Sequence, residues 1–232
     1  MIERVAVVVP ARDEQDTLPA CLDSLRVAAR ELQSSRPDLD VRTVLVLDEC
    51  TDGSPGQLAG AGDLDVLQVR ARSAGGARAA GAAHALRSGA HAGERTWLAN
   101  TDADSRVPRD WLVEMVEDAE RGAHLVLGTV EPDDDLDPSI RERWRARHLL
   151  VEGHPHVHAA NLGIRADVYN RLGGWAALAS GEDADLAARA RREPGLVIRR
   201  TSRIPVITSS RLVARAPRGF ATYLAALGTA TA

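Results

Sequence analysis

The first hundred residues contain four short apolar segments, which we expect to be strands. They span residues 5–9, 41–47, 64–69 and 96–99. Short apolar runs bounded by turn residues are typical of strands buried on both faces of a parallel sheet. We expect Pro10 to end the first strand, because proline cannot donate a backbone hydrogen bond.

Helical periodicity lies between these segments. From Asp13 onward, apolar residues recur on one helix face at Leu18, Leu22, Leu25 and Ala29, and an Ala-rich helix is expected from Ala74 to Ala90. Strands that alternate with helices at this spacing predict βαβ units, and therefore an α/β fold with a parallel sheet. Ligands bind beyond the carboxyl ends of such strands, which is where Arg12, Asp48, Arg72 and Asp102 fall.

The second half of the chain is less regular. We expect helices over 108–120 and 139–152 and from Asp183, strands over 125–130 and after His158, a Gly-Gly turn at 173–174, a solvated acidic loop at 131–135 and a frayed end at 225–232. The four arginines of the 139–152 segment alternate, so they spread around the helix and do not form a binding patch. No repeat or linker divides the sequence, and we expect one domain over residues 1–232.

Composition narrows the function classes. The net charge of -4 argues against a general nucleic-acid-binding protein. All 29 basic residues are arginine, so Schiff-base chemistry and a P-loop lysine are excluded, whereas arginine can clamp phosphates. We see no signal peptide, and no apolar stretch approaches the roughly 20 residues of a transmembrane helix. Cys21 and Cys50 form no Cys-x-x-Cys pair and fit a reducing compartment. From these three features together we expect a soluble cytoplasmic protein.

Two acidic clusters carry the candidate chemistry. Asp102-Ala103-Asp104 follows the strand over 96–99, and Glu182-Asp183-Ala184-Asp185 lies much further along the chain. Two carboxylates one residue apart at a strand end can hold one divalent cation, which stabilises a diphosphate leaving group. Asp-x-Asp is also common in solvated surface turns. The second cluster favours a metal site and a catalytic base in one pocket.

Five segments resemble motifs of the family 2 glycosyltransferases, which have the GT-A fold. They are Pro10-Ala11-Arg12-Asp13-Glu14, the segment 48–54, the segment 72–78, Asp102-Ala103-Asp104, and Gly173-Gly174-Trp175 with Glu182-Asp183-Ala184-Asp185-Leu186. The resemblance covers nearly the whole chain and implies a Rossmann-like, mostly parallel central sheet flanked by helices. It also implies a nucleotide-sugar-binding half over about 1–105 and an acceptor-binding half over about 106–232. Arg12 departs from the family in residue type but is expected to keep its role.

The resemblance implies roles for individual residues. The nucleotide would contact Pro10, Ala11, Arg12, Glu14, Asp48, Gly76, Arg78 and Asp102. Asp102 and Asp104 would hold Mn²⁺ or Mg²⁺. Asp183 would be the general base and Glu182 would orient the acceptor, with an exchange of these two roles left open. Small residues at a helix start let backbone amides approach a phosphate; for Arg78 the alternative is a packed Ala/Gly-rich helix.

Three histidines alternate at His154, His156 and His158. In an extended segment they share one face, and three histidines on one face can bind zinc. The alternative, which the neighbouring loop favours, is a solvated or substrate-facing strip. Related enzymes often carry a metal-binding histidine downstream of the base, but residues 206–210 contain none. One of the three histidines, a hydroxyl or water is left for that position, and His158 is our candidate.

Together these features predict a metal-dependent glycosyltransferase of the hexosyltransferase type. It would use a nucleotide-diphospho-sugar, UDP in preference to GDP, and would invert the anomeric centre. We expect a small soluble acceptor such as a metabolite or sugar phosphate, with a peripheral lipid-linked acceptor still open. The basic segment 211–220 would close over the diphosphate or be a solvated loop.

Three other functions were weighed. One is a degenerate homologue that binds nucleotide without turnover. A sugar-phosphate nucleotidyltransferase is less well supported, because its Gly-rich loop and lysine are absent. An NAD-dependent enzyme is disfavoured because no Gly-x-Gly-x-x-Gly follows the first strand.

Overall fold

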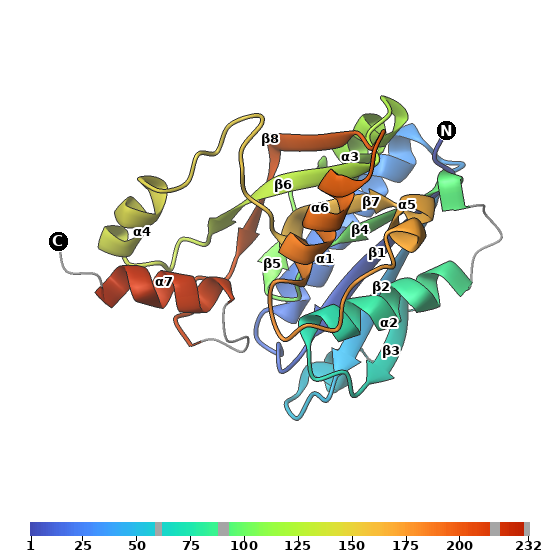
Figure 1. Ribbon diagram of the computed structural model, residues 1–232. Coiled ribbons are helices and arrows are strands. Elements are labelled where there is room, and N and C mark those ends of the chain that lie inside the picture. The colour runs from blue at the N-terminus through green and yellow to red at the C-terminus, as the bar shows by residue number, and fades with distance from the viewer. Residues whose placement is uncertain (59–61, 88–92, 214–218, 230–232) are drawn as a thin grey trace.

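A mixed sheet runs through the molecule, with helices on both of its faces (Figure 1). The structure is a computed structural model that describes residues 1–58, 62–87, 93–213 and 219–229. In these residues the sheet has eight strands in the order β3-β2-β1-β4-β7-β6-β8-β5. The predicted α/β class with a mostly parallel, helix-flanked sheet is confirmed.

The four strands of the first half are parallel neighbours. They are β1 (Arg4–Ala11), β2 (Asp40–Asp48), β3 (Leu64–Val69) and β4 (Thr96–Asn100). Pro10 lies inside β1, so the expectation that it ends the strand is wrong. Pairing of β1 with β4 stops at Val8, whose carbonyl accepts from Thr101. Pro10 faces the same side two residues further on, where β4 has ended and no backbone donor is needed.

Helices cover the two faces of these strands with separate apolar cores. On one face α1 (Leu18–Ser35) and α3 (Trp111–Glu120) pack against Val5, Val7 and Val9 of β1. On the other face α2 (Ala74–Arg87), α5 (Ala166–Arg171) and α6 (Glu182–Arg192) pack against Ala6 and Val8. Because successive strand residues point to opposite faces, a strand covered on both sides is apolar throughout.

A glycine in the middle of α2 lets this helix pack closely on the sheet. A Cβ on Gly81 would lie 2.6 Å from a methyl of Val8 and 2.7 Å from a methyl of Val46. Only glycine therefore lets the helix approach the strands so closely. The predicted end of this helix at Ala90 lies outside the described residues.

The second half adds strands of both directions. They are β5 (Ser105–Arg106), β6 (Leu125–Pro132), β7 (Leu162–Arg165) and β8 (Ile198–Thr208). β7 is antiparallel to β4 and β6, β8 is parallel to β6, and β5 is antiparallel to β8. The first two residues of the predicted acidic loop belong to β6, because Glu131 and Pro132 pair with Ile207 and Thr208. Single turns of 3₁₀ helix lie at Ser54–Leu58, Gly93–Arg95 and Ala159–Asn161.

A small third core joins α4 (Pro138–Arg145) and α7 (Phe220–Thr229). The predicted helix over 139–152 is too long, because α4 ends at Arg145 and the chain turns away there. Residues 225–229 are helical and not frayed, because Leu224 and Leu227 of α7 pack against Ile140 and Trp144 of α4. Figure 1 shows this helix pair lying to one side of the main sheet.

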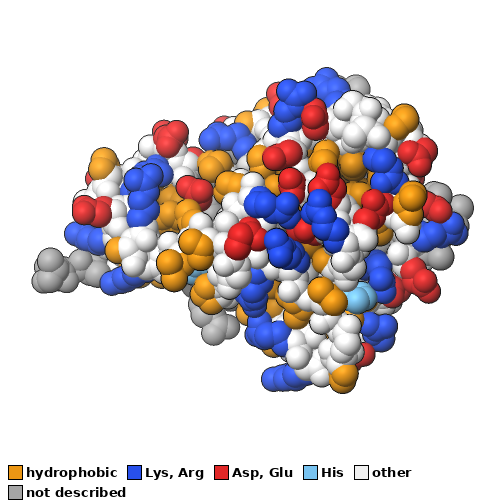
Figure 2. Space-filling model, turned by 90° about the horizontal axis from the view of Figure 1, so that it is seen from above, with side chains coloured by type: hydrophobic (Ala, Val, Ile, Leu, Met, Phe, Trp, Pro, Cys, Tyr) orange, Lys and Arg blue, Asp and Glu red, His pale blue; other side chains and the backbone are white. Residues whose placement is uncertain are grey.

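Charged side chains of both signs are intermixed on the surface, as the view in Figure 2 shows for one face. Many form local exposed pairs, such as Arg26 with Asp63 at 2.8 Å. Such exposed pairs contribute little to stability. Among the described residues, no helix combines the length and the apolar character that crossing a bilayer requires.

Candidate functional site

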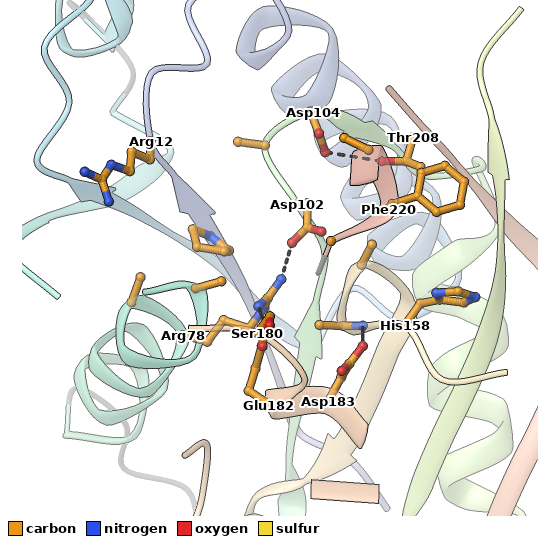
Figure 3. Close-up of a pocket in the computed structure, with 18 of the residues that line it drawn as sticks. Arg12, Arg78, Asp102, Asp104, His158, Ser180, Glu182, Asp183, Thr208 and Phe220 are labelled. Atoms are coloured by element: carbon orange, nitrogen blue, oxygen red, sulfur yellow. Dashed lines mark hydrogen bonds and ion pairs between the residues drawn. The ribbon is translucent and has the colours of Figure 1, made fainter. Parts of the chain in front are cut away.

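A cleft of about 780 Å³ opens at the carboxyl ends of β1, β2 and β4. The starts of α2 and α6 form its other walls (Figure 3). The structure brings eleven of the twelve predicted site residues into its lining, namely Pro10, Ala11, Arg12, Glu14, Asp48, Arg78, Asp102, Asp104, His158, Glu182 and Asp183. Gly76 is outside the lining, and its N–H donates to the Ser73 hydroxyl at 3.1 Å, which caps α2.

Arg78 ties the two acidic clusters together. Its guanidinium is buried and donates to both Asp102 and Glu182 (Figure 3). It also lies over the Trp175 ring, with its Cζ 5.6 Å from the centroid. Burial raises the pKa of Glu182, and the charge of Arg78 opposes that rise. This arrangement fixes Glu182 as an anchoring side chain and leaves Asp183 beside it in the cleft.

Asp104 forms an ion pair with a second arginine of the cleft. Arg211 donates to Asp104 Oδ2 and to Glu14 Oε2, both at 2.9 Å. The other carboxylate oxygen, Oδ1, accepts from the Thr208 hydroxyl at 3.3 Å. Burial and the neighbouring charge of Asp102 raise the pKa of Asp104 to about 6, against the opposing effect of Arg211.

Asp183 stands at the first turn of α6, at the edge of the cleft. Its Oδ2 accepts from the backbone N–H of Ala159 at 3.1 Å, and its Oδ1 accepts from the N–H of Ala184 at 2.7 Å. Gly181, the residue before the helix, has φ +83°, a conformation that favours glycine. These two backbone N–H groups fix the Asp183 carboxylate at the amino end of α6, where it lines the cleft.

Asp48 fixes the end of β2 to the loop before α2. Its Oδ1 accepts from the N–H groups of Ala71 (2.7 Å) and Arg72 (3.0 Å), and its side chain is buried. Arg72 has φ +54° and forms an exposed pair with Glu49 at 2.7 Å. Within the described residues no hydrogen bond reaches the second oxygen of Asp48. This oxygen could accept a hydrogen bond from an N–H group of a nucleobase.

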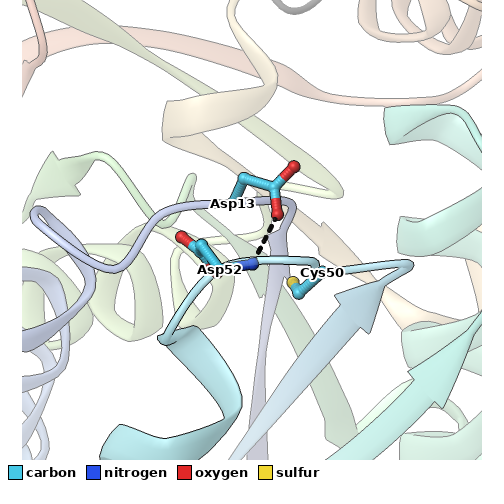
Figure 4. A group of neighbouring side chains, drawn as sticks. All are labelled: Asp13, Cys50 and Asp52. Atoms are coloured by element: carbon cyan, nitrogen blue, oxygen red, sulfur yellow. Dashed lines mark hydrogen bonds between the residues drawn. The ribbon is translucent and has the colours of Figure 1, made fainter.

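Asp13 closes the loop that the helical pattern assigns to the first helix. It has φ +53°, and its Oδ1 accepts from the N–H groups of Thr51 (2.6 Å) and Asp52 (3.2 Å). The helix therefore begins at Leu18, five residues later than predicted. Asp13, Cys50 and Asp52 lie together (Figure 4), but their hydrogen bonds hold the loop, and burial keeps the pKa of the Cys50 thiol raised.

The three alternating histidines do share one face, as the stacking of their rings shows. His154 is buried and its Nε2 faces the carbonyls of Leu127 (3.2 Å) and Thr201 (3.3 Å). Only His158 of the three lines the cleft. Among the described residues, the ligand atoms of these histidines and the two aspartates do not gather into a cluster within 4.8 Å. A solvated strip is wrong for His154, which is buried, whereas His158 lines the cleft.

Several cleft residues were missed by the sequence reasoning. Thr208 lies in the segment where a histidine was sought, and only the hydroxyl alternative anticipated it. His148, Phe220 and Tyr223 also line the cleft. Phe220 ends the basic segment 211–220 that the sequence singled out, whereas no motif marks His148 or Tyr223, which reach the cleft only through the packing of α4 on α7. Residues 214–218 of the predicted basic loop lie outside the described residues.

The donor set at Asp102 and Asp104 fits a divalent cation. Carboxylate and hydroxyl oxygens are the ligands that Mg²⁺ and Mn²⁺ prefer. Burial, and after it the charge of Asp102, raises the pKa of Asp104, and a bound cation would offset both effects. Asp102, Asp104 and the Thr208 hydroxyl would hold it, and Arg211 now partly neutralises Asp104.

Known proteins resemble this chain in sequence profile and in fold. The sequence profile of Glycosyl transferase family 2 matches residues 6–173. A crystal structure of S. aureus TarS in complex with UDP has a TM-score of 0.60 at 14% identity, over 89% of this chain and 61% of that chain.

Glucosyl-3-phosphoglycerate synthase from Mycobacterium tuberculosis, in complex with Mn²⁺, UDP and glucosyl-3-phosphoglycerate, has a TM-score of 0.59 at 16% identity, over 99% of this chain and 81% of that chain. At these identities the likeness concerns the fold, which is that of the GT-A glycosyltransferases. No curated protein matches the sequence.

Proposed function

The chain belongs to glycosyl transferase family 2, and on this premise we propose that it moves a sugar from a UDP-sugar to an acceptor hydroxyl with the aid of Mn²⁺ or Mg²⁺. The observation that carries the proposal is the bridge of Arg78 between Asp102 and Glu182. It joins the cation-binding motif to the helix that bears the base, so that donor phosphates and acceptor hydroxyl would meet in one cleft.

The end of the cleft beside β1 and β2 supports a nucleotide site. Pro10, Ala11 and Arg12 follow one strand, and Asp48 ends the next. Asp48 would accept a hydrogen bond from an N–H group of the nucleobase, and Arg12 lies at this end of the cleft in Figure 3. UDP is the preferred carrier because UDP is bound in the TarS and M. tuberculosis structures that share the fold.

Asp102 and Asp104 support the cation. A divalent cation bound there would neutralise the charge that develops on the departing diphosphate. The M. tuberculosis structure holds Mn²⁺. Asp104 must be ionised to bind a cation, and its pKa of about 6 leaves it ionised above neutral pH.

Asp183 is proposed as the general base. Its carboxylate lies in the cleft beside the Arg78 bridge, and two backbone N–H groups hold it in place. It would take the proton of the acceptor hydroxyl as that oxygen attacks the anomeric carbon and the bond to the diphosphate breaks. One direct displacement of this kind inverts the anomeric centre. Glu182 is committed to Arg78, which supports Asp183 over Glu182 in this role.

The test is release of UDP or GDP from UDP-glucose, UDP-galactose, UDP-N-acetylglucosamine and GDP-mannose with Mn²⁺ present and with water or an added glucoside as the acceptor of the sugar. Asp183→Asn should lower the rate by about 10²-fold or more, because a general base contributes that much, while leaving UDP binding unchanged. Asp185→Asn is the matched control, since Asp185 lies two residues away and pairs with Arg189 at 2.6 Å. A degenerate homologue would bind a nucleotide and release none, and full activity of Asp183→Asn would overturn the role of the base.

A further inference from the structure

The end of the cleft opposite Arg12 is walled by rings. His148, His158, Phe220 and Tyr223 all line it, and Figure 3 shows His158 and Phe220 on the side away from Arg12. These four residues, called the ring wall below, come from the segment after α4, from the segment before β7 and from α7. Val157 adds an apolar side chain to the lining.

Stacking holds the ring wall in place. The His148 ring lies between Trp144 (centroids 4.6 Å apart) and His156 (4.9 Å), and Tyr223 meets it edge-on at 5.4 Å. His156 in turn stacks on His158 at 6.0 Å. Trp144 is fully buried in the core between α4 and α7. The wall is therefore built on packed side chains, and its shape does not depend on a ligand.

Phe220 and Tyr223 bring no cationic group to the ring wall, and the His158 ring is stacked on His156. Burial, and then the neighbouring histidines, lower the pKa of His158 to about 3. Burial likewise lowers the pKa of His156. The part of each ring that lines the cleft offers an acceptor an apolar surface.

The described arginines of the cleft do not supply a cation there either. Arg78 and Arg211 each bridge two carboxylates. Arg72 pairs with Glu49, and Arg12 lies at the nucleotide end. Arg215 and Arg218 lie outside the described residues. A phosphorylated acceptor would find no cation among the described side chains of this wall.

We propose that the ring wall is the acceptor subsite, and that it takes an uncharged hydroxyl compound bearing an aromatic or apolar ring. This inference rests on the proposed function and replaces the expectation of a sugar phosphate as acceptor. Asp183 accepts a hydrogen bond from Ala159, the residue after His158, so the base stands directly beside the wall. A ring packed on His158 and Phe220 would place its hydroxyl within reach of Asp183.

Two glucosides that differ only in the aglycone, and one sugar phosphate, test the proposal. Phenyl β-D-glucoside, methyl β-D-glucoside and glucose 6-phosphate are titrated calorimetrically into the protein, with and without UDP and Mn²⁺. The phenyl compound should bind at least tenfold more tightly than the methyl compound, and the phosphate no more tightly than the methyl compound. Tightest binding of glucose 6-phosphate, equal binding of all three, or no binding of the phenyl compound would each overturn the proposal.

Variants separate the wall from a general effect on folding. His158→Ala and Phe220→Ala should each weaken binding of the phenyl compound by roughly fivefold, as expected for the loss of one ring contact. His158→Phe keeps a ring and should keep the binding, as should Val197→Ala, a control at an exposed side chain before β8. If the two alanine variants bind the phenyl compound as tightly as the wild type does, the ring wall is not the acceptor subsite. Failure of UDP to bind would count against the proposed function and not against the ring wall. The two outcomes are distinguishable because binding of the glucosides is also measured without nucleotide.

Discussion

The buried Arg78 pairs with the half-buried Asp102, which ties the first turns of α2 to the end of β4. The same guanidinium pairs with Glu182 at the start of α6, so three elements distant in sequence meet at one side chain. One arginine between two carboxylates leaves that group with a net negative charge. The cleft is therefore prepared for a cationic ligand, and its geometry depends on Arg78.

Replacing Arg78 by methionine should destabilise the protein by about 3–5 kcal/mol, because it strands two carboxylates that are partly or fully buried. Urea unfolding measures this change. Adding Asp102→Asn and Glu182→Gln should restore much of the loss. The control is Arg72→Met, whose pair with Glu49 is exposed and should contribute less than about 1 kcal/mol. Equal effects of the two single variants would refute a special role for Arg78.

Binding of Mn²⁺ should weaken below about pH 6. The raised pKa of Asp104 lies at about 6, so protons and the cation compete for this carboxylate below that value. The affinity should fall up to about tenfold per pH unit there and level off at higher pH. Electron paramagnetic resonance of free Mn²⁺ between pH 5 and 8 reports it. A pH-independent affinity in the wild type would contradict the assignment of Asp104.

Removing Arg211 should strengthen binding of Mn²⁺ in the absence of nucleotide. Its guanidinium pairs with Asp104 at 2.9 Å and so competes with a metal for that oxygen. Arg211→Ala is compared with Arg109→Ala, which breaks an exposed pair with Glu31 on the surface. Binding is measured by calorimetry at pH 8, because Asp104 is ionised at this pH in both variants. Weaker binding by Arg211→Ala would mean that Arg211 helps to hold the site open for the metal.

His154, His156 and His158 should lower the free energy of unfolding as the pH falls. Their pKa values are lowered in the folded state, so the unfolded chain binds more protons below about pH 6.5. Their contribution is complete above that pH and declines as the pH falls toward 3, by about 1.4 kcal/mol per pH unit for each proton taken up on unfolding. Urea unfolding at pH 7 and pH 5 measures the slope.

Asp104 acts in the opposite direction, because its raised pKa favours the folded state as the pH falls from 6 toward 4. The histidine slope is therefore measured in an Asp104→Asn background without metal. His158→Phe should make the slope shallower by up to one proton. An unchanged slope would show that His158 is protonated equally in the folded and unfolded chains.

Local sequence patterns predicted the parts of the fold whose cause is local. Continuous apolar strands and intervening helical periods specify the parallel half of the sheet, and Asp102-Ala103-Asp104 marks the end of β4. The predicted start of a helix or strand was wrong where a contact with a residue distant in sequence determines it. Asp13 leaves the helical conformation because it accepts N–H groups from Thr51 and Asp52, 38 and 39 residues away.

Site residues that arrive through tertiary packing were invisible to sequence reasoning. Thr208 reaches Asp104 because β8 pairs with β5, a strand of two residues that no pattern indicates. Tyr223 reaches the cleft because α7 packs on α4 through Leu224 and Leu227. Neither contact has a signature at short range, since each depends on the register of elements far apart in the chain.

The most direct test of the central claim is thermal unfolding with UDP or GDP, each with and without Mn²⁺, in the wild type and in Asp104→Asn. A ligand at a hundred times its dissociation constant adds about 2.7 kcal/mol, which moves the midpoint by several degrees in a chain of this length. We predict that UDP with Mn²⁺ raises the midpoint of the wild type and that Asp104→Asn loses the metal-dependent part. No shift with either nucleotide, or the same shift without metal in both proteins, would contradict a metal-dependent nucleotide-sugar site in this cleft.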